Sequence, residues 1–183
     1  NPLFLESLTT LVGVASVYLL TVGRGSGWPL GCLWIVLTGY IYWGAGLVGS
    51  ASLQLFFLAT QLIGWWRWKT GVEQDLRVSS TYLSTGQRLG ATLALLLCWI
   101  GLAQWLLKIG SVGAWADAFV TTGSLFAQTM MVSGKKECWL VWAVVNLVYI
   151  GLNLPQQLWA FSLLYGLFLL LAVHGWREWT RTV

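Results

Sequence analysis

Residues 25–66 read GSGWPLGCLWIVLTGYIYWGAGLVGSASLQLFFLATQLIGWW, a stretch of 42 residues without a single Asp, Glu, Lys, Arg or His. A transmembrane helix needs about 20 predominantly apolar residues, so this stretch is long enough for two spans joined by a turn. Residues 138–173 form a second uncharged stretch of similar length. Both stretches therefore predict helical hairpins in a lipid bilayer.

The composition of the whole chain agrees with a membrane protein. Of its 183 residues, 57% are hydrophobic and 9% are charged, whereas soluble domains carry about 25% charged residues. The apolar runs are continuous and lack the alternation of an outer-membrane β-barrel, which leaves helices as the spanning structure. We predict an all-α integral membrane protein with seven spans, at residues 5–22, 29–47, 50–68, 88–107, 114–133, 138–153 and 157–176.

The basic residues predict how the chain is oriented. Seven spans place the two termini on opposite sides, and nine of the ten Lys and Arg residues then fall on one side, with only Lys108 on the other. By the positive-inside rule, the C-terminus is cytoplasmic and the N-terminus lies outside. Because the basic residues are scattered at helix ends, we expect no nucleic acid partner. The nine residues are Arg24, Arg67, Lys69, Arg77, Arg88, Lys135, Lys136, Arg177 and Arg181.

The chain also contains an internal repeat. A shift of 111 residues aligns Glu6–Trp68 with Asp117–Trp179 without a gap and gives ten identities in 63 positions. Repeated units of this kind indicate repeated structure. The equivalent pairs are Glu6 and Asp117, Thr10 and Thr121, Gly23 and Gly134, Trp28 and Trp139, Gly64 and Gly175, Trp65 and Trp176, and Trp68 and Trp179.

The repeat predicts a 3+1+3 arrangement of helices. We divide the chain into a first three-helix repeat at 5–68, a cytoplasmic loop and linker helix at 69–113, and a second three-helix repeat at 114–179. The single linker helix returns the chain to the side where it started, so the two repeats are parallel. Transporters built from such halves place their substrate between them, near the middle of the bilayer.

Polar and aromatic residues inside the predicted spans outline a candidate binding site. In the sixth span, Trp139, Trp142, Asn146 and Tyr149 follow one another at offsets of 0, 3, 7 and 10, which places them on one helix face. The third span carries a similar row of Gln54, Gln61, Trp65 and Trp68. Trp faces attract organic cations and amides pair with hydroxyls, so this lining suits a small, flat, positively charged solute.

A structural reading of the same residues stays open. Trp28, Trp68, Trp139 and Trp179 lie near span ends, where an aromatic belt at the membrane interface would place them. The amides of Gln54, Gln61 and Gln128 could equally bond between helices. Trp142 lies about one turn deeper than Trp139, in line with Asn146, and is the stronger candidate for the site.

Several motifs together resemble one known family. They are Ser52-Leu53-Gln54 with Phe56-Phe57 and Gly64-Trp65-Trp66-Arg67-Trp68; Asp117 with Ser124 and Gln128; Glu137-Cys138-Trp139-Leu140-Val141-Trp142 with Asn146 and Tyr149; and Leu164-Tyr165 with Gly175-Trp176 and Trp179. In these motifs the chain resembles the PnuC family of bacterial vitamin transporters, which is structurally akin to the SWEET sugar transporters.

The resemblance implies both a function and a site. It implies a bacterial inner-membrane protein, often a homotrimer, that lets an unphosphorylated vitamin precursor cross by facilitated diffusion before a cytoplasmic kinase traps it. Nicotinamide riboside is the first expected substrate, thiamine the second and riboflavin the third. The family's binding positions correspond here to Gln54, Trp139, Trp142 and Asn146, and the transfer extends to Tyr149 and Gln128.

The sequence also limits the mechanism. It has no phosphate-binding loop for ATP and no acidic residue in the middle of a predicted span, so we expect uniport without a cofactor. An enzyme is not expected, because no nucleophile with a base and no carboxylate pair is present. A substrate-binding membrane subunit of a larger transporter is the remaining alternative.

Overall fold

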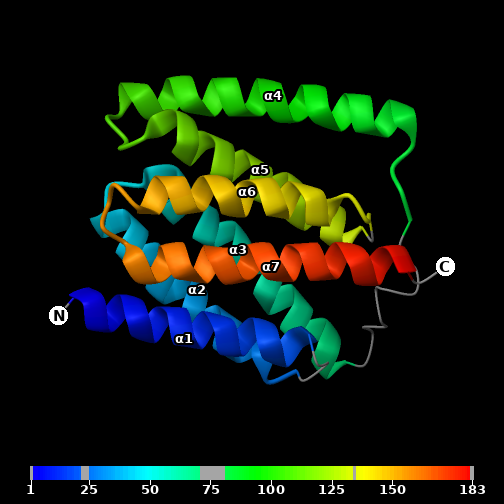
Figure 1. Ribbon diagram of the computed structural model, residues 1–183, viewed down its shortest axis with the longest axis horizontal. Helices are drawn as coiled ribbons and strands as arrows, with labels where there is room; N and C mark the ends of the chain where they lie inside the picture. The colour runs from blue at the N-terminus through cyan, green and yellow to red at the C-terminus, as the bar shows by residue number, and fades with distance from the viewer. Residues whose placement is uncertain (1, 22–24, 71–80, 134, 182–183) are drawn as a thin grey trace.

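The computed structural model describes residues 2–21, 25–70, 81–133 and 135–181. These residues form seven α-helices that run back and forth along one direction, so the predicted all-helical class is confirmed (Figure 1). The helices are α1 Pro2–Thr21, α2 Gly27–Gly44, α3 Val48–Lys69, α4 Thr85–Lys108, α5 Ala114–Val132, α6 Cys138–Asn153 and α7 Trp159–Arg181.

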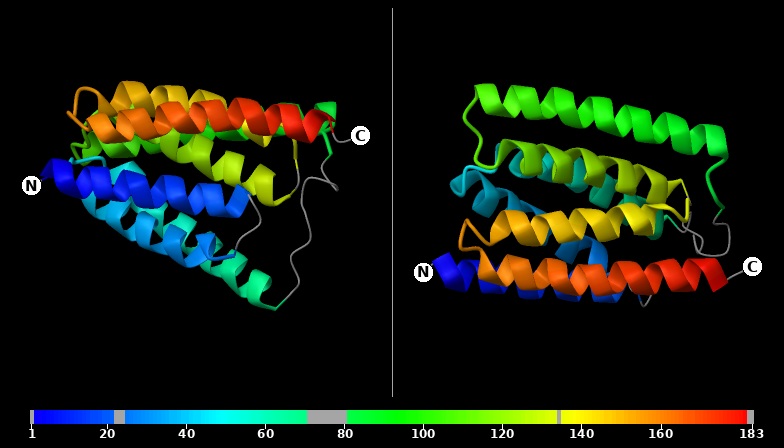
Figure 2. Two further views of the ribbon diagram at one scale, coloured as in Figure 1. Left: turned by 60° about the horizontal axis from the view of Figure 1, so that its bottom comes forward. Right: turned by 45° about the horizontal axis from the view of Figure 1, so that its top comes forward.

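Consecutive helices pack into two groups. One group contains α1, α2 and α3, the other contains α5, α6 and α7, and the groups meet where α3 contacts α5 and α1 contacts α7. Helix α4 lies at one edge of the molecule and packs against α5 (Figure 2). The two termini lie at opposite ends, as an odd number of spans requires (Figure 1). Arg24 and Arg77, which belong to the predicted basic side, lie outside the described residues.

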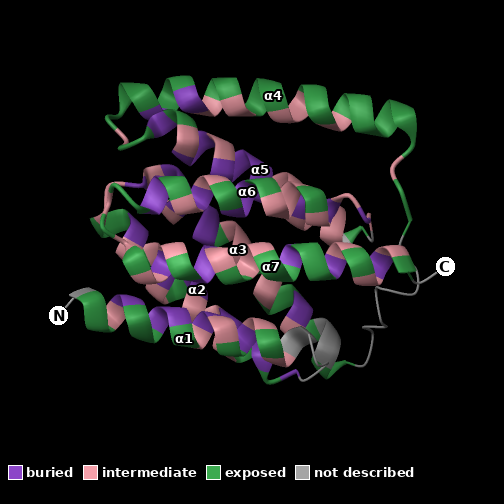
Figure 3. Cartoon of the chain, viewed as in Figure 1, coloured by how far each residue is buried: buried purple, intermediate pink, exposed green. Residues whose placement is uncertain are grey.

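The outside of the bundle suits a lipid environment. Within the described residues, three helical segments are long and apolar enough to cross a membrane, namely Val48–Trp66, Thr85–Lys108 and Trp159–Arg181, and Leu3–Leu19 and Cys138–Asn153 are shorter apolar segments. Large apolar side chains cover the exposed surface, whereas buried residues lie where helices pack against one another (Figure 3). This distribution is expected where lipid rather than water contacts the surface.

Helices α2 and α7 begin and end at residues that differ from the predicted spans 29–47 and 157–176. Helix α2 begins at Gly27, two residues before Pro29, because proline fits the first turn, where its missing N–H has no partner to lose. Helix α7 was expected over 157–176 but runs over Trp159–Arg181. Gln157 has a φ of 59° and belongs to the preceding turn. The helix continues beyond residue 176 because Trp179 packs edge-to-face on Trp139, with 5.5 Å between ring centroids.

Glycines let two tryptophans approach a neighbouring helix closely. A Cβ atom built on Gly64 would lie 2.2 Å from the Trp28 ring, and one built on Gly175 would lie 2.6 Å from the Trp139 ring. Each tryptophan therefore fills the space that a glycine leaves on the last helix of its own group. Trp28 and Trp139 are thus packing residues, in addition to lying near helix ends as a membrane belt requires.

We predict that Gly175→Ala destabilises the protein by about 1–3 kcal/mol, because the added methyl group must displace the Trp139 ring. Gly166→Ala is the matched control on the same helix, since no atom lies within 4 Å of a Cβ built there. It should be neutral or slightly stabilising, because alanine favours helix over glycine. Apparent unfolding midpoints in detergent test this, and equal midpoints for the two variants would contradict the packing role.

Candidate functional site

A buried carboxylate joins the two helix groups. Asp117, in the first turn of α5, accepts hydrogen bonds from the backbone N–H groups of Gly49 and Ser50, both at 2.8 Å. The hydroxyl groups of Ser50 and Ser111 also donate to it. Because Gly49 and Ser50 begin α3, the charge of Asp117 satisfies otherwise unpaired N–H groups at the positive end of that helix.

Glu6 makes a similar contact on the other side of the molecule. Its side chain is 4% exposed, and its Oε1 accepts a 2.9 Å hydrogen bond from the backbone N–H of Phe161 near the start of α7. Glu6 and Asp117 are equivalent in the repeat, and so are Phe161 and Ser50. Each acid therefore acts on the start of a helix in the other group.

Three buried tyrosines near these acids, Tyr42, Tyr149 and Tyr165, form a tyrosine cluster in the interior. The hydroxyl of Tyr42, on α2, donates to that of Tyr165, on α7, at 2.9 Å, and the Asn153 amide lies 3.5 Å from the Tyr42 oxygen. The rings of Tyr149 and Tyr165 stack with centroids 4.2 Å apart. Tyr42, Tyr149 and Tyr165 are all buried, and the ring of Tyr149 also lies parallel to that of Tyr42, with centroids 6.1 Å apart.

These polar contacts lie at one end of the bundle. The hydrogen bonds of Asp117, Glu6 and Tyr42 that join the α1–α3 group to the α5–α7 group lie toward the end where α1, α3, α5 and α7 begin. Toward the opposite end, α3 diverges from α7 (Figure 2). These bonds therefore tie the two groups together at the end where those four helices begin, which we call the tied end.

Three predicted site residues of α6 face the interior between the groups. Trp142 contacts the ring of Phe57 on α3, with centroids 6.2 Å apart. Asn146, one turn further along, is 3% exposed, and its amide forms no hydrogen bond with a described residue. Tyr149, on the same helix face, belongs to the tyrosine cluster. Three of the four residues in the predicted row on α6 thus lie at the junction of the groups.

Several buried polar atoms in this interior lack partners among the described residues. They include the indole nitrogens of Trp34 and Trp142. Buried polar groups are costly unless they bond to protein, water or a ligand. A solute with hydroxyl or amide groups would satisfy donors and acceptors that the protein leaves free.

Trp34 and Phe168 extend this interior beyond the predicted set. The Trp34 ring, on α2, meets that of Phe168, on α7, edge-to-face with centroids 5.6 Å apart. A Cβ atom on Gly13 would lie 2.6 Å from the Trp34 indole nitrogen, so this glycine makes room for the ring. The sequence could have indicated this role, because Trp34 lies about two turns inside its helix and away from both membrane interfaces.

Other predicted site residues contact their own helix group. Gln54 is buried, donates to the Ser50 carbonyl of its own helix at 3.0 Å, and lines a groove of about 350 Å³ between α2 and α3. Gln61 donates to the Trp28 carbonyl at 3.4 Å. Gln61 thus makes a hydrogen bond between helices, as the structural reading expected, whereas the hydrogen bond of Gln54 stays within α3.

The remaining three predicted residues lie at separate places. Trp65 carries the Lys69 ammonium group over its ring, 5.4 Å from the centroid. Trp139 packs on Gly175, and its indole nitrogen is buried without a partner among the described residues. Gln128 is half-buried on α5. Contact of these residues, or of Gln54 and Gln61, with a solute stays a prediction.

The fold matches that of a solved transporter. The structure titled "Crystal structure of the Vitamin B3 transporter PnuC" superposes with a TM-score of 0.79, covering 98% of this chain and 82% of that chain at 24% identity. At this identity the match establishes the fold. Together with the apolar helices, it defines an all-helical multi-pass membrane protein.

Sequence comparison then gives the family. The family model "Nicotinamide mononucleotide transporter" matches residues 3–181, and the chain belongs to that family. The nicotinamide riboside transporter PnuC of Haemophilus influenzae is 24% identical over 98% of this chain and 80% of its own length. The riboflavin/roseoflavin transporter RibM of Streptomyces davaonensis is 30% identical over 83% of this chain and 73% of its own length.

The comparisons confirm three predictions. The resemblance to the PnuC family is correct, and the chain is a transporter rather than an enzyme. Its apolar helices and its family make it a multi-pass protein of the inner membrane.

We predict that Asp117→Ala destabilises the protein more than Glu6→Ala does. Asp117 accepts four hydrogen bonds, and their loss should cost about 3 kcal/mol or more, whereas Glu6 accepts one and should cost about 1–2 kcal/mol. Asp117→Asn keeps one acceptor oxygen and should fall between them. Unfolding midpoints in detergent give the order, and equal losses for the two alanine variants would contradict it.

Proposed function

We propose that this chain is a uniporter for nicotinamide riboside, which it lets cross the membrane down its concentration gradient. The observation that carries the proposal is the set of buried, unpartnered polar groups among aromatic rings at the junction of the helix groups. The names of the relatives and of the family support the same substrate class.

The chemistry of the interior suits the two halves of this solute. The pyridinium ring is flat and positively charged, and the faces of Trp142, Phe57 and Trp34 offer stacking and cation–π attraction. The ribose hydroxyls and the carboxamide need hydrogen-bond partners. Asn146 supplies both donors and acceptors, and the indole N–H groups supply donors.

We further propose that the two helix groups are structural repeats, joined as 3+1+3 by α4. Two kinds of equivalent contact support this arrangement. Trp28 packs on Gly64 as Trp139 packs on Gly175, each pair being offset by 111 residues. The acids of α1 and α5 contact the starts of α7 and α3 in the same reciprocal way. An axis between the groups would relate these contacts, and the solute would cross beside it.

We also propose that no ion drives transport. Intramembrane acids are the usual carriers of coupling protons or sodium ions, but Asp117 and Glu6 are already bonded to helix N-termini. A cytoplasmic kinase that phosphorylates the solute would then keep uptake running. The gathering of basic residues at one end favours a cytoplasmic C-terminus and an external N-terminus. The homotrimer stays a prediction from the resemblance.

Riboflavin is a second candidate, because the riboflavin/roseoflavin transporter RibM is 30% identical to this chain. Riboflavin is also a flat ring system with a hydroxylated chain, but it is larger and uncharged. An interior that relies on cation–π attraction would favour the pyridinium compound. Direct comparison of the two vitamins separates the candidates.

We predict that the purified chain binds nicotinamide riboside more tightly than riboflavin or thiamine. Trp142→Ala and Asn146→Ala should each weaken binding about tenfold or more, since they remove a ring face and an amide at the junction. Trp159→Ala, at a position 57% exposed, is the matched control and should leave affinity unchanged. Titration calorimetry provides the measurement. Tighter binding of riboflavin would reassign the substrate, and unchanged affinity in both site variants would reject the site.

We predict that proteoliposomes containing only this chain take up nicotinamide riboside until the internal and external concentrations are equal. An imposed proton or sodium gradient should leave that end point unchanged, because no free intramembrane acid is available. Protein-free liposomes are the control. Accumulation above the external concentration would contradict uniport, and binding without any flux would indicate a subunit that requires a partner.

A further inference from the structure

A second groove lies between α4 and α5, away from the junction of the helix groups. The two helices pack closely around Ala103, Leu106, Ala114 and Ala118, where α4 ends and α5 begins. They diverge toward the start of α4 (Figure 1). The wedge between them measures about 430 Å³ and is lined by Leu83, Gln87, Ala91, Leu125, Phe126, Thr129, Met130, Ser133 and Lys135.

The lining is amphipathic along its length. Ala91, Leu125 and Phe126 lie toward the middle of the two helices, whereas Gln87, Ser133 and Lys135 lie toward the membrane surface, at the start of α4 and just beyond α5. One end of the wedge therefore suits an acyl chain, and the other suits a polar headgroup.

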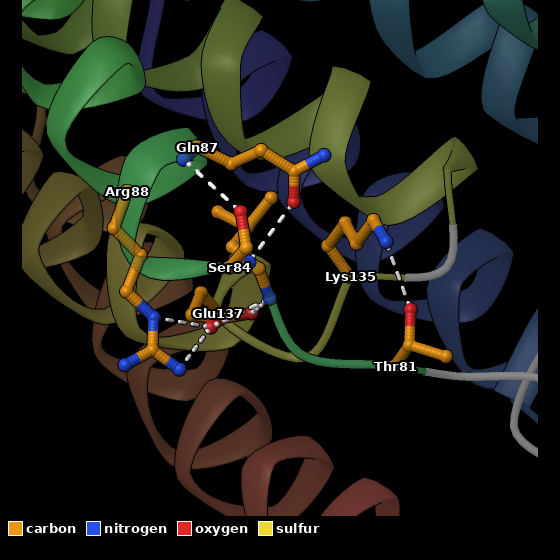
Figure 4. A network of polar contacts seen from close by, with 7 residues as sticks. Thr81, Ser84, Gln87, Arg88, Lys135 and Glu137 are labelled. Carbon is orange, nitrogen blue, oxygen red and sulfur yellow. Dashed lines mark hydrogen bonds and ion pairs between the residues drawn. The ribbon is translucent and has the colours of Figure 1, made fainter.

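The polar end carries an excess of positive charge. Arg88 and Lys135 lie in this region together with the carboxylate of Glu137 (Figure 4). A third cation, the buried Lys136, adjoins Glu137 in the chain and places its ammonium group over the Tyr82 ring. That carboxylate is occupied, because Arg88 forms an ion pair with it at 2.9 Å and the Leu83 backbone N–H donates to it. Among the described residues, the partners of the Glu137 carboxylate are thus Arg88 and Leu83, and neither lysine is among them.

Donors at this end remain unused. The Lys135 ammonium group donates to the hydroxyl of Thr81 at 2.8 Å, which leaves two of its three N–H bonds without a partner among the described residues. The Gln87 carbonyl oxygen accepts from the Ser84 backbone N–H, but the Gln87 amide nitrogen donates to no described residue. Both side chains line the same groove and can donate to one phosphate group.

We propose that this groove binds an anionic phospholipid, with its phosphate on Lys135 and Gln87 and an acyl chain between α4 and α5. Basic pockets between transmembrane helices recognise anionic headgroups in this way. Only 11% of the membrane-spanning window of α4 is buried, against 28% for those of α3 and α7, so lipid has access to the wedge from the side. The lipid would fill a space that the two helices leave open.

The test uses the full chain in detergent, with phosphatidylglycerol and phosphatidylcholine of identical acyl chains as probes. Binding is followed by native mass spectrometry, and the unfolding midpoint is measured in parallel. We expect phosphatidylglycerol to bind about fivefold more tightly, since a surface lysine contributes roughly that factor with an anionic lipid. Lys135→Gln should abolish the preference, and Lys108→Gln, at the other end of α4, should retain it.

A second pair of variants tests the acyl-chain part. Ala91→Trp should fill the wedge and weaken binding of both lipids, whereas Leu97→Trp, at a position of α4 that is 72% exposed, should leave both unchanged. Equal affinity of the original chain for the two lipids would overturn the proposal. So would inorganic phosphate that raises the midpoint as much as phosphatidylglycerol, which would indicate a free-anion site. Loss of an oligomer in Ala91→Trp with lipid binding intact would assign the groove to a second copy of the chain.

Discussion

The contacts of Asp117 and Glu6 with the first N–H groups of α3 and α7 are the constraint on which the rest of the structure depends. A helix that starts inside a membrane protein exposes N–H groups that lipid cannot satisfy. Here each set receives a carboxylate from the other helix group, and a carboxylate is the strongest acceptor a side chain offers. The bonds therefore fix how the groups sit against each other and hold the tyrosine cluster between them at the same end.

Once that end is fixed, side-chain packing determines how the interior is arranged. Tyr42, Tyr149 and Tyr165 bury one another, and the groups diverge beyond them toward Trp142, Asn146 and Trp34. At the tied end the carboxylates of Asp117 and Glu6 and the hydroxyl of Tyr42 find protein partners. The amide of Asn146 and the indole nitrogens of Trp34 and Trp142 find none among the described residues, so a solute between the groups would satisfy them.

The sequence predicts the helices and the family well, because both depend on local patterns. Uncharged runs of helix length mark the spans, and the short motifs around Trp139 and Trp142 mark the relatives. It predicts long-range contacts poorly. Glu6 and Asp117 look like acids at the starts of their own helices, and only the fold brings them to residues 155 and 68 positions away in the chain. The link between Tyr42 and Tyr165 and the contact of Trp34 with Phe168 span similar distances.

The hydrogen bonds at the tied end bear on how such a chain could move. To part the groups at the tied end, charged hydrogen bonds of Asp117 and Glu6 and the tyrosine link must break, and their partners must find water instead. Away from the tied end the groups also meet through side-chain packing such as that of Phe57 on Trp142. A solute that bonds to Asn146 and stacks on Trp142 would add contacts between the groups there, and so would change the relative stability of the two ends.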